Sequence, residues 1–150
     1  MDIAVIYASY HHHNTRAVAS AMADEVGADL FSVNEAPRDL SPYGLVCFGS
    51  GIYAMRHHRS LIRYVASLPA EHRDVAIFST SGLGWKRLHR DLRGLVQGKG
   101  FHIVGEYACR AYDTFGPLRL IGGINRGRPS ASDLSRARAF IRGVARYEEK

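Results

Sequence analysis

Several features that identify other protein classes are missing from this chain of 150 residues. No apolar run is long enough to cross a bilayer, and the chain does not open with the basic stretch and apolar run of a secretory signal. Its two cysteines, Cys47 and Cys109, lie in or at the end of apolar runs, which indicates buried thiols rather than a disulfide framework. With 46% apolar residues, the chain is expected to form one domain over residues 1–150, cytoplasmic and without a membrane span.

A basic block interleaved with aromatic residues is also missing, although the net charge is +6. The 20 Lys and Arg residues are spread along the whole sequence, which argues against a nucleic-acid partner. A basic surface of this kind also suits anionic small molecules and acidic protein partners. Ordinary solvated arginines remain the simplest interpretation of the charge.

Glycine is missing between Ile3 and Val26, and no Gly-Lys-Ser/Thr sequence occurs anywhere. These absences exclude the dinucleotide-binding fingerprint and the Walker loop. What the segment does contain is an apolar run over Ile3–Tyr7, a polar stretch over Ser9–Thr15, and apolar residues at helical spacing beyond it. This order predicts a buried parallel strand, a short loop and a helix.

The first N–H groups of a helix have no partner within it, so the predicted loop could hold an anion. Ser9, Asn14 and Thr15 add side chains that can donate to phosphate oxygens. An ordinary turn between strand and helix, with Asn14 as the helix cap, explains the same residues equally well. This segment alone does not decide between the two.

The rest of the chain repeats the same alternation of strands and helices. Further strands are predicted at Ala28–Val33, Leu45–Phe48, Val75–Phe78 and Phe101–Cys109. We expect an α/β fold with a five-stranded parallel sheet in the order 2-1-3-4-5 and helices on both faces. His102 and Glu106 are expected on one face of the last strand. Trp85 could wall a bound ring or pack in the core, and the core is the simpler expectation. A loop of about twenty residues is predicted over Arg110–Pro129, longer than compact domains normally carry.

Small and polar residues concentrate where the predicted strands end. Gly49–Tyr53 offers glycines for the close approach of a flat ligand and a tyrosine ring for stacking, and Ser79–Gly82 offers N–H donors. Each segment alone reads equally well as a turn or a helix cap. Together with the first loop they describe a site for flavin mononucleotide, FMN.

The sequence resembles the flavodoxin-like superfamily over nearly its whole length. SYHHHNT stands at the position of the phosphate loop, GSGIY at the ring-stacking loop, and FSTSG at the third loop. The segments CRAYDTFGP and GGINRGRP are similar to two motifs of a microbial group of small flavodoxin-domain proteins. His13 stands in place of the loop glycine, and Ala111 in place of the second glycine of the late motif. The resemblance implies a three-layer sandwich that binds FMN.

The resemblance also implies roles for single residues. Ser9, Asn14, Thr15 and the backbone of Tyr10, His11, His12 and His13 would hold the phosphate. Tyr53 would stack on the ring, beside Ser50, Gly51 and Ile52. Thr80, Ser81 and Gly82 would face the pyrimidine edge of the flavin.

The expected function is electron transfer or a small flavin-dependent oxidoreductase activity, with a redox protein or a small molecule as electron acceptor. GIYAMRHHRSLIRYV is also similar to flavodoxin-like protoporphyrinogen oxidases, so a flavin-dependent oxidase or quinone reductase is one alternative. A flavin-free interaction module is the other, and His13 favours it. No metal site is expected from His11–His13, His57 and His58, since three consecutive histidines cannot face one ion. No serine occupies a nucleophile elbow, so no catalytic residue is predicted.

Overall fold

A computed structural model describes residues 2–9, 14–53, 55–110 and 129–148. The central sheet has the strand order β2-β1-β3-β5-β6, and each of these neighbours is parallel. Its strands are β1 (Asp2–Ala8), β2 (Asp29–Ser32), β3 (Tyr43–Tyr53), β5 (Arg73–Ser81) and β6 (Phe101–Arg110). The predicted five-stranded order is confirmed.

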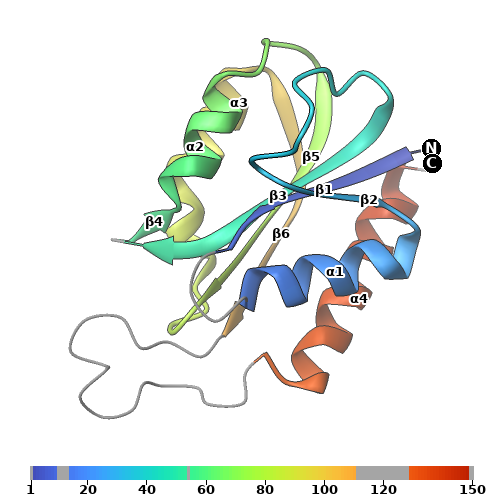
Figure 1. Cartoon of the computed structure of the whole chain (residues 1–150), viewed down its shortest axis with the longest axis vertical. Helices are drawn as coiled ribbons and strands as arrows, with labels where there is room; N and C mark the ends of the chain where they lie inside the picture. The colour runs from blue at the N-terminus through green and yellow to red at the C-terminus, as the bar shows by residue number, and fades with distance from the viewer. Residues whose placement is uncertain (1, 10–13, 54, 111–128, 149–150) are drawn as a thin grey trace.

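The helices form two layers, one on each face of the sheet (Figure 1). On one face lie α1 (Asn14–Val26) and α4 (Ala131–Glu148), and on the other lie α2 (Arg59–Ala66) and α3 (Arg90–Gly98). A short 3-10 helix, η1 (Lys86–His89), leads into α3. No helix within the described ranges is long and apolar enough to span a membrane.

The three strands β1, β3 and β5 are buried on both faces, as their apolar runs predict. Ile6, Phe48 and Ile77 point toward α2 and α3, whereas Val5, Cys47 and Phe78 point toward α1 and α4. A reciprocal cap begins α4: the Asp133 carboxylate accepts from the Ser130 N–H at 2.8 Å, and Ser130 Oγ accepts from the Asp133 N–H at 3.2 Å.

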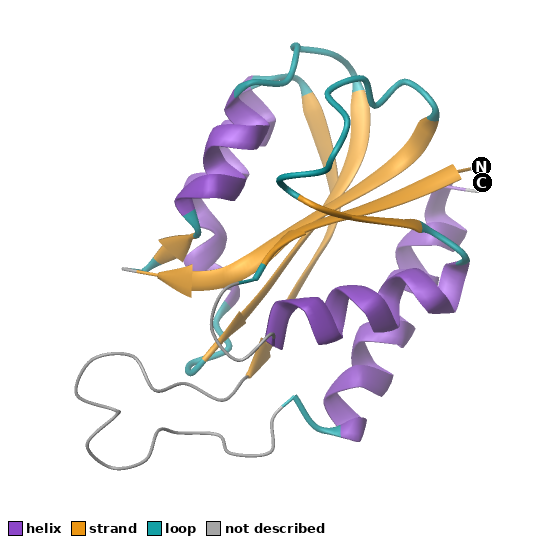
Figure 2. Cartoon of the chain, viewed as in Figure 1, coloured by secondary structure: helices purple, strands orange, loops and turns teal. Residues whose placement is uncertain are grey.

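Gly49 was expected to end its strand, but β3 runs on through it to Tyr53 (Figure 2). A Cβ atom at Gly49 would lie 2.3 Å from the Phe78 ring. The glycine is therefore required by packing between β3 and β5, and not by a turn. Beyond the sheet, β3 pairs in antiparallel fashion with a sixth strand that was not predicted, β4 (Arg56–His57).

The expectation that His102 and Glu106 share a face of β6 is wrong. The ladder pairs Ile103 with Val75 and Gly105 with Ala76, so Val104 is an extra residue in β6. Such a bulge shifts the alternation of side chains by one position. Glu106 consequently faces η1 and α3, where it bonds to His89 and Arg93 respectively.

Candidate functional site

The segments expected to form the site meet at the carboxyl edge of the sheet. Ala8 is in register with Ser50, and Gly51 is in register with Thr80. Because the strands are parallel, the ends of β1, β3 and β5 lie side by side at this edge (Figure 1). The structure thus brings together Ser9, Ser50–Tyr53 and Thr80–Gly82, which come from three separate parts of the sequence.

A hydrogen bond joins the first helix to this edge. Thr15 Oγ1 lies 2.8 Å from Thr80 Oγ1, and the two residues are only 2% and 4% exposed. Ser9 Oγ accepts a long bond of 3.4 Å from the Arg16 N–H in the first turn of α1. Asn14 is the first residue of the helix. Tyr10, His11, His12 and His13 lie outside the described residues.

A cavity of about 170 Å³ opens beside the start of α1. It lies between the ends of β1 and β2, and Ser9 and Arg16 border it together with Tyr7, Ala8, Ser32, Val33 and Asn34. A serine hydroxyl, an arginine and the start of a 13-residue helix are groups that suit a phosphate.

The ring-contacting segment Ser50–Tyr53 belongs to strand β3, not to a free loop. Ser50 Oγ accepts from the His58 N–H at 2.9 Å and donates to the Gly51 carbonyl at 2.6 Å. The Tyr53 ring packs edge-on against His58, with ring centroids 4.9 Å apart. A Cβ atom at Gly51 would come within 3.1 Å of the Tyr53 ring, so glycine there gives the tyrosine room. Tyr53 remains partly exposed at the edge.

The third segment turns tightly after β5. Ser81 Oγ accepts from the Gly84 N–H at 2.8 Å, and Gly84 has a φ of +63°, a conformation that glycine adopts without strain. This turn leaves Leu83 and Trp85 exposed. The expectation that Trp85 lies in the core is therefore wrong. Arg87 covers one face of its ring instead, at 3.9 Å from the centroid.

A buried polar network that the sequence analysis did not find lies on the opposite face of β5 from Thr80. Ser79 Oγ lies 2.6 Å from His89 Nε2, and His89 Nδ1 lies 2.9 Å from Glu106 Oε1. Arg93 donates to both oxygens of the same carboxylate, at 3.0 and 2.8 Å. An ionised carboxylate only accepts, so His89 Nδ1 carries the proton and Nε2 accepts from the Ser79 hydroxyl.

This serine, histidine and glutamate have the bonding order of a hydrolase triad, but Ser79 and His89 are 0% exposed. A nucleophile must reach its substrate, so the network cannot serve as a hydrolytic site in this fold. Instead it fixes the end of β5 to η1 and β6, directly before Thr80–Gly82.

Protonation in this network follows from burial. Burial lowers the pKa of His89 against the opposing effect of Glu106. Burial alone would raise the pKa of Glu106, but the hydrogen bonds from Arg93 and His89 outweigh this effect and lower it. Both pKa shifts favour a neutral imidazole beside an ionised carboxylate.

His57 is a second buried histidine, packed against His89 with ring centroids 4.9 Å apart. Its Nε2 lies 2.9 Å from the Phe78 carbonyl oxygen, which accepts the Nε2 proton. Burial lowers the pKa of His57 to about 3, and its Nδ1 has no hydrogen-bond partner.

Metal binding finds no support among the described residues. No group of three His, Cys, Asp or Glu side chains there is arranged to hold an ion. His57 and His58 have structural roles instead, since His58 Nδ1 accepts from the Ser60 N–H at 3.0 Å and caps α2. Both cysteines are buried and outside any disulfide, as expected, and burial raises the pKa of Cys47 to about 12.

The family model described as flavodoxin domain matches residues 4–94. The chain belongs to the flavodoxin domain family. This stretch runs from within β1 to within α3 and thus includes all three segments at the carboxyl edge. A protein of Methanocaldococcus jannaschii, described as uncharacterized, is 35% identical over 147 residues, which are 96% of this chain and 98% of the relative.

Solved flavodoxins share the fold at low sequence identity. A flavodoxin from the domain Archaea superposes with a TM-score of 0.74 at 15% identity and 100% coverage of both chains. Flavodoxin 2 from Bacillus cereus superposes with a TM-score of 0.70 at 13% identity, covering 98% of this chain and 99% of that one.

Proposed function

We propose that this protein binds FMN at the carboxyl edge of its sheet and transfers electrons to or from a partner. The observation that supports this most strongly is the Thr15–Thr80 hydrogen bond, which ties the predicted phosphate segment to the predicted ring segment. Family membership supports a flavin, and the single strand-loop-helix unit for a phosphate supports FMN over FAD.

The donors at this edge fit the chemistry of FMN. Ser9 and the start of α1 offer hydroxyl and N–H groups that suit a phosphate, with Asn14, Thr15 and Arg16 in the first turn. Tyr10–His13 would add backbone donors. Tyr53 would stack on one ring face beside Ser50–Ile52, while Thr80, Ser81 and Gly82 would contact the pyrimidine edge.

The flavin, when bound, supplies the redox chemistry, and the protein supplies position and electrostatics. Neutral hydroxyl and N–H donors at the ends of β3 and β5 would stabilise negative charge that develops on the ring during reduction. The Ser79–His89–Glu106 network would hold the β5 donors in place.

Absorption spectroscopy of the purified protein tests the proposal. We expect flavin bands in the visible, and release of FMN as the main chromophore on denaturation and chromatography. Recovery of FAD would contradict the choice of flavin. Failure of the flavin-free protein to take up added FMN would support the interaction module instead.

The role of Tyr53 has a test of its own. Tyr53→Ala is expected to weaken FMN binding tenfold or more, because stacking on an aromatic ring contributes about 1–3 kcal/mol. Tyr43→Phe, at the opposite end of β3, is the control and should bind FMN as the wild type does. Equal affinities for Tyr53→Ala and wild type in a fluorescence titration would show that Tyr53 does not stack.

A further inference from the structure

Three large apolar side chains lie exposed at the carboxyl edge of the sheet. Met55 is 63% exposed, Leu83 is 41% exposed and Trp85 is 40% exposed. Met55 lies between β3 and β4, whereas Leu83 and Trp85 follow β5. The two turns that carry them are neighbours, because β4 lies against η1. The three side chains therefore lie exposed on neighbouring turns at this edge, and we call them the apolar cluster.

The backbone of Met55 adopts an unfavourable conformation. Its φ is +67°, in the left-handed region that a residue with a Cβ atom rarely adopts. A strained backbone at a functional surface is retained when it presents a side chain that is needed there. Packing does not explain the strain, since the side chain is the most exposed of the large apolar ones among the described residues.

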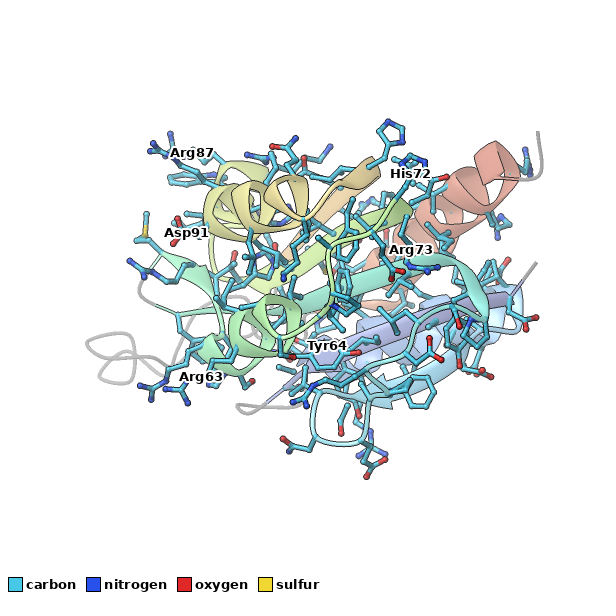
Figure 3. All side chains as sticks on the ribbon, turned by 90° about the horizontal axis from the view of Figure 1, so that it is seen from above. Arg63, Tyr64, His72, Arg73, Arg87 and Asp91 are labelled. Atoms are coloured by element: carbon cyan, nitrogen blue, oxygen red, sulfur yellow. The ribbon has the colours of Figure 1, made fainter. Side chains whose placement is uncertain are left out.

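Positive charge surrounds this cluster. Residues 55–70 and 82–93 contain seven Lys and Arg side chains, of which Arg93 is paired with Glu106, and one acidic residue, Asp91. Arg56, Lys86 and Arg87 stand directly beside the apolar side chains and are exposed. Figure 3 shows Arg87 and Asp91 near one another, away from His72, with Arg63 farther off across the same side of the molecule.

The one acidic side chain neutralises little of this charge. Asp91 pairs with Arg56 at 3.3 Å, but the two side chains are 49% and 63% exposed. Exposed pairs of this kind are weak, so the positive potential of the surface persists. An apolar centre of Met and Trp with a rim of arginines is typical of a protein interface.

We infer that Met55, Arg56, Leu83, Trp85, Lys86 and Arg87 form the docking surface for an acidic protein that exchanges electrons with the bound cofactor. The inference rests on the proposed function for its redox role, because these residues adjoin the segments that would hold the flavin ring. A second copy of the chain does not fit, since it would bring a like charge to the surface.

An acidic two-iron ferredoxin is the probe, and isothermal titration calorimetry measures its binding to the protein as purified and to the flavin-free protein. We expect binding at 50 mM NaCl that weakens at least tenfold at 300 mM. Trp85→Ala and the pair Lys86→Glu/Arg87→Glu should each weaken binding tenfold or more. Two controls lie on other surfaces: Leu30→Ala on β2 and Arg146→Glu on α4, both at exposed positions, should change it less than twofold.

Met55→Gly separates docking from folding. Glycine relieves the positive φ, so we expect the thermal midpoint to stay the same or to rise while ferredoxin binding falls several-fold. If Met55→Gly leaves binding unchanged, or Arg146→Glu weakens it as much as the Lys86 and Arg87 changes do, the docking surface is wrong. Tighter binding of a 20-nucleotide thymidine strand, or of phosphatidylserine vesicles, would overturn it in favour of a nucleic acid or a membrane.

The same titrations distinguish this inference from the proposed function. If the protein cannot take up FMN but still binds ferredoxin at the Met55–Trp85 surface, the docking inference is supported and the proposal of FMN binding is contradicted. A flavin-loaded protein that binds no ferredoxin at 50 mM NaCl would contradict docking and leave the flavin proposal standing.

Discussion

The hydroxyl oxygens of Thr15 and Thr80 lie 2.8 Å apart, although the two residues are 65 positions apart in the sequence. Thr15 belongs to the first turn of α1, and Thr80 lies near the end of β5. One oxygen must donate to the other, so each satisfies its partner where water has little access. The bond fixes the helix start against the sheet edge on which the candidate site is built.

Thr80→Val removes one hydroxyl with little change of shape and leaves that of Thr15 buried without its partner. We expect the free energy of unfolding to fall by about 1–3 kcal/mol. Thr80→Ser keeps the hydroxyl and should lose less, and the double variant with Thr15→Val should recover part of the loss. Urea denaturation measures all three. Equal stability of Thr80→Val and wild type would show that the bond contributes nothing.

Stability should depend on pH through His57 and His89, because burial lowers the pKa of both. Below the usual histidine pKa of about 6.5 the unfolded chain binds protons that the folded chain does not. Stability should therefore fall as the pH falls from 6.5, by up to about 1.4 kcal/mol per pH unit for each histidine. Above this range the two groups should add no pH dependence.

Urea denaturation at pH 7.5 and 5.5 tests this dependence, and His57→Gln should reduce it. His72→Gln, at an exposed position between α2 and β5, is the matched control (Figure 3). An equal pH dependence in wild type and His57→Gln would mean that His57 does not remain neutral in the fold.

Gly49→Ala should destabilise the protein because the added Cβ would lie 2.3 Å from the Phe78 ring. Overpacking of this kind costs about 1–3 kcal/mol. Gly94→Ala is a matched control within α3, where an added Cβ meets nothing within 4 Å. It should stabilise the protein by up to about 1 kcal/mol, since alanine is the better helix former. Thermal denaturation should move the two variants in opposite directions.

Glu106→Gln should weaken the network that holds the end of β5. The substitution removes the charge that both His89 and Arg93 contact, so we expect a loss of about 1–3 kcal/mol. Asp74→Asn is the control, because Asp74 on β5 pairs with His102 on β6 at a more exposed position. This variant should lose less than about 1 kcal/mol of unfolding free energy. Similar losses in the two variants would show that the network is no stronger than a surface pair.

The sequence was sufficient to predict the strand order, because the apolar runs of β1, β3 and β5 distinguish the central strands from the edges. It was misleading at Gly49, where a glycine that accommodates the Phe78 ring resembles one that begins a turn. Likewise, the bulge at Val104 leaves no trace in the alternation of β6, since it depends on how the strand pairs with β5.

In the candidate site, too, some features could be predicted from the sequence and others could not. Segments at strand ends can be found from the sequence because parallel strands bring their carboxyl ends to one edge. Ser79, His89 and Glu106 could not be connected, since they lie 10 and 17 residues apart and their contact depends on how η1 packs against β6. Trp85 was misplaced because an aromatic residue at helical spacing normally marks a core, whereas here it precedes η1 and faces solvent.

The burial of Cys47 and Cys109 has a consequence for electrochemistry. They are the two cysteines of the whole chain, they form no disulfide, and the sheet and its helices enclose them. A thiol shielded from solvent in this way does not exchange with disulfides or mediators. Reversible electron uptake by a flavin-loaded sample should then come from the flavin alone, and a coulometric titration should count those electrons without a background from the polypeptide.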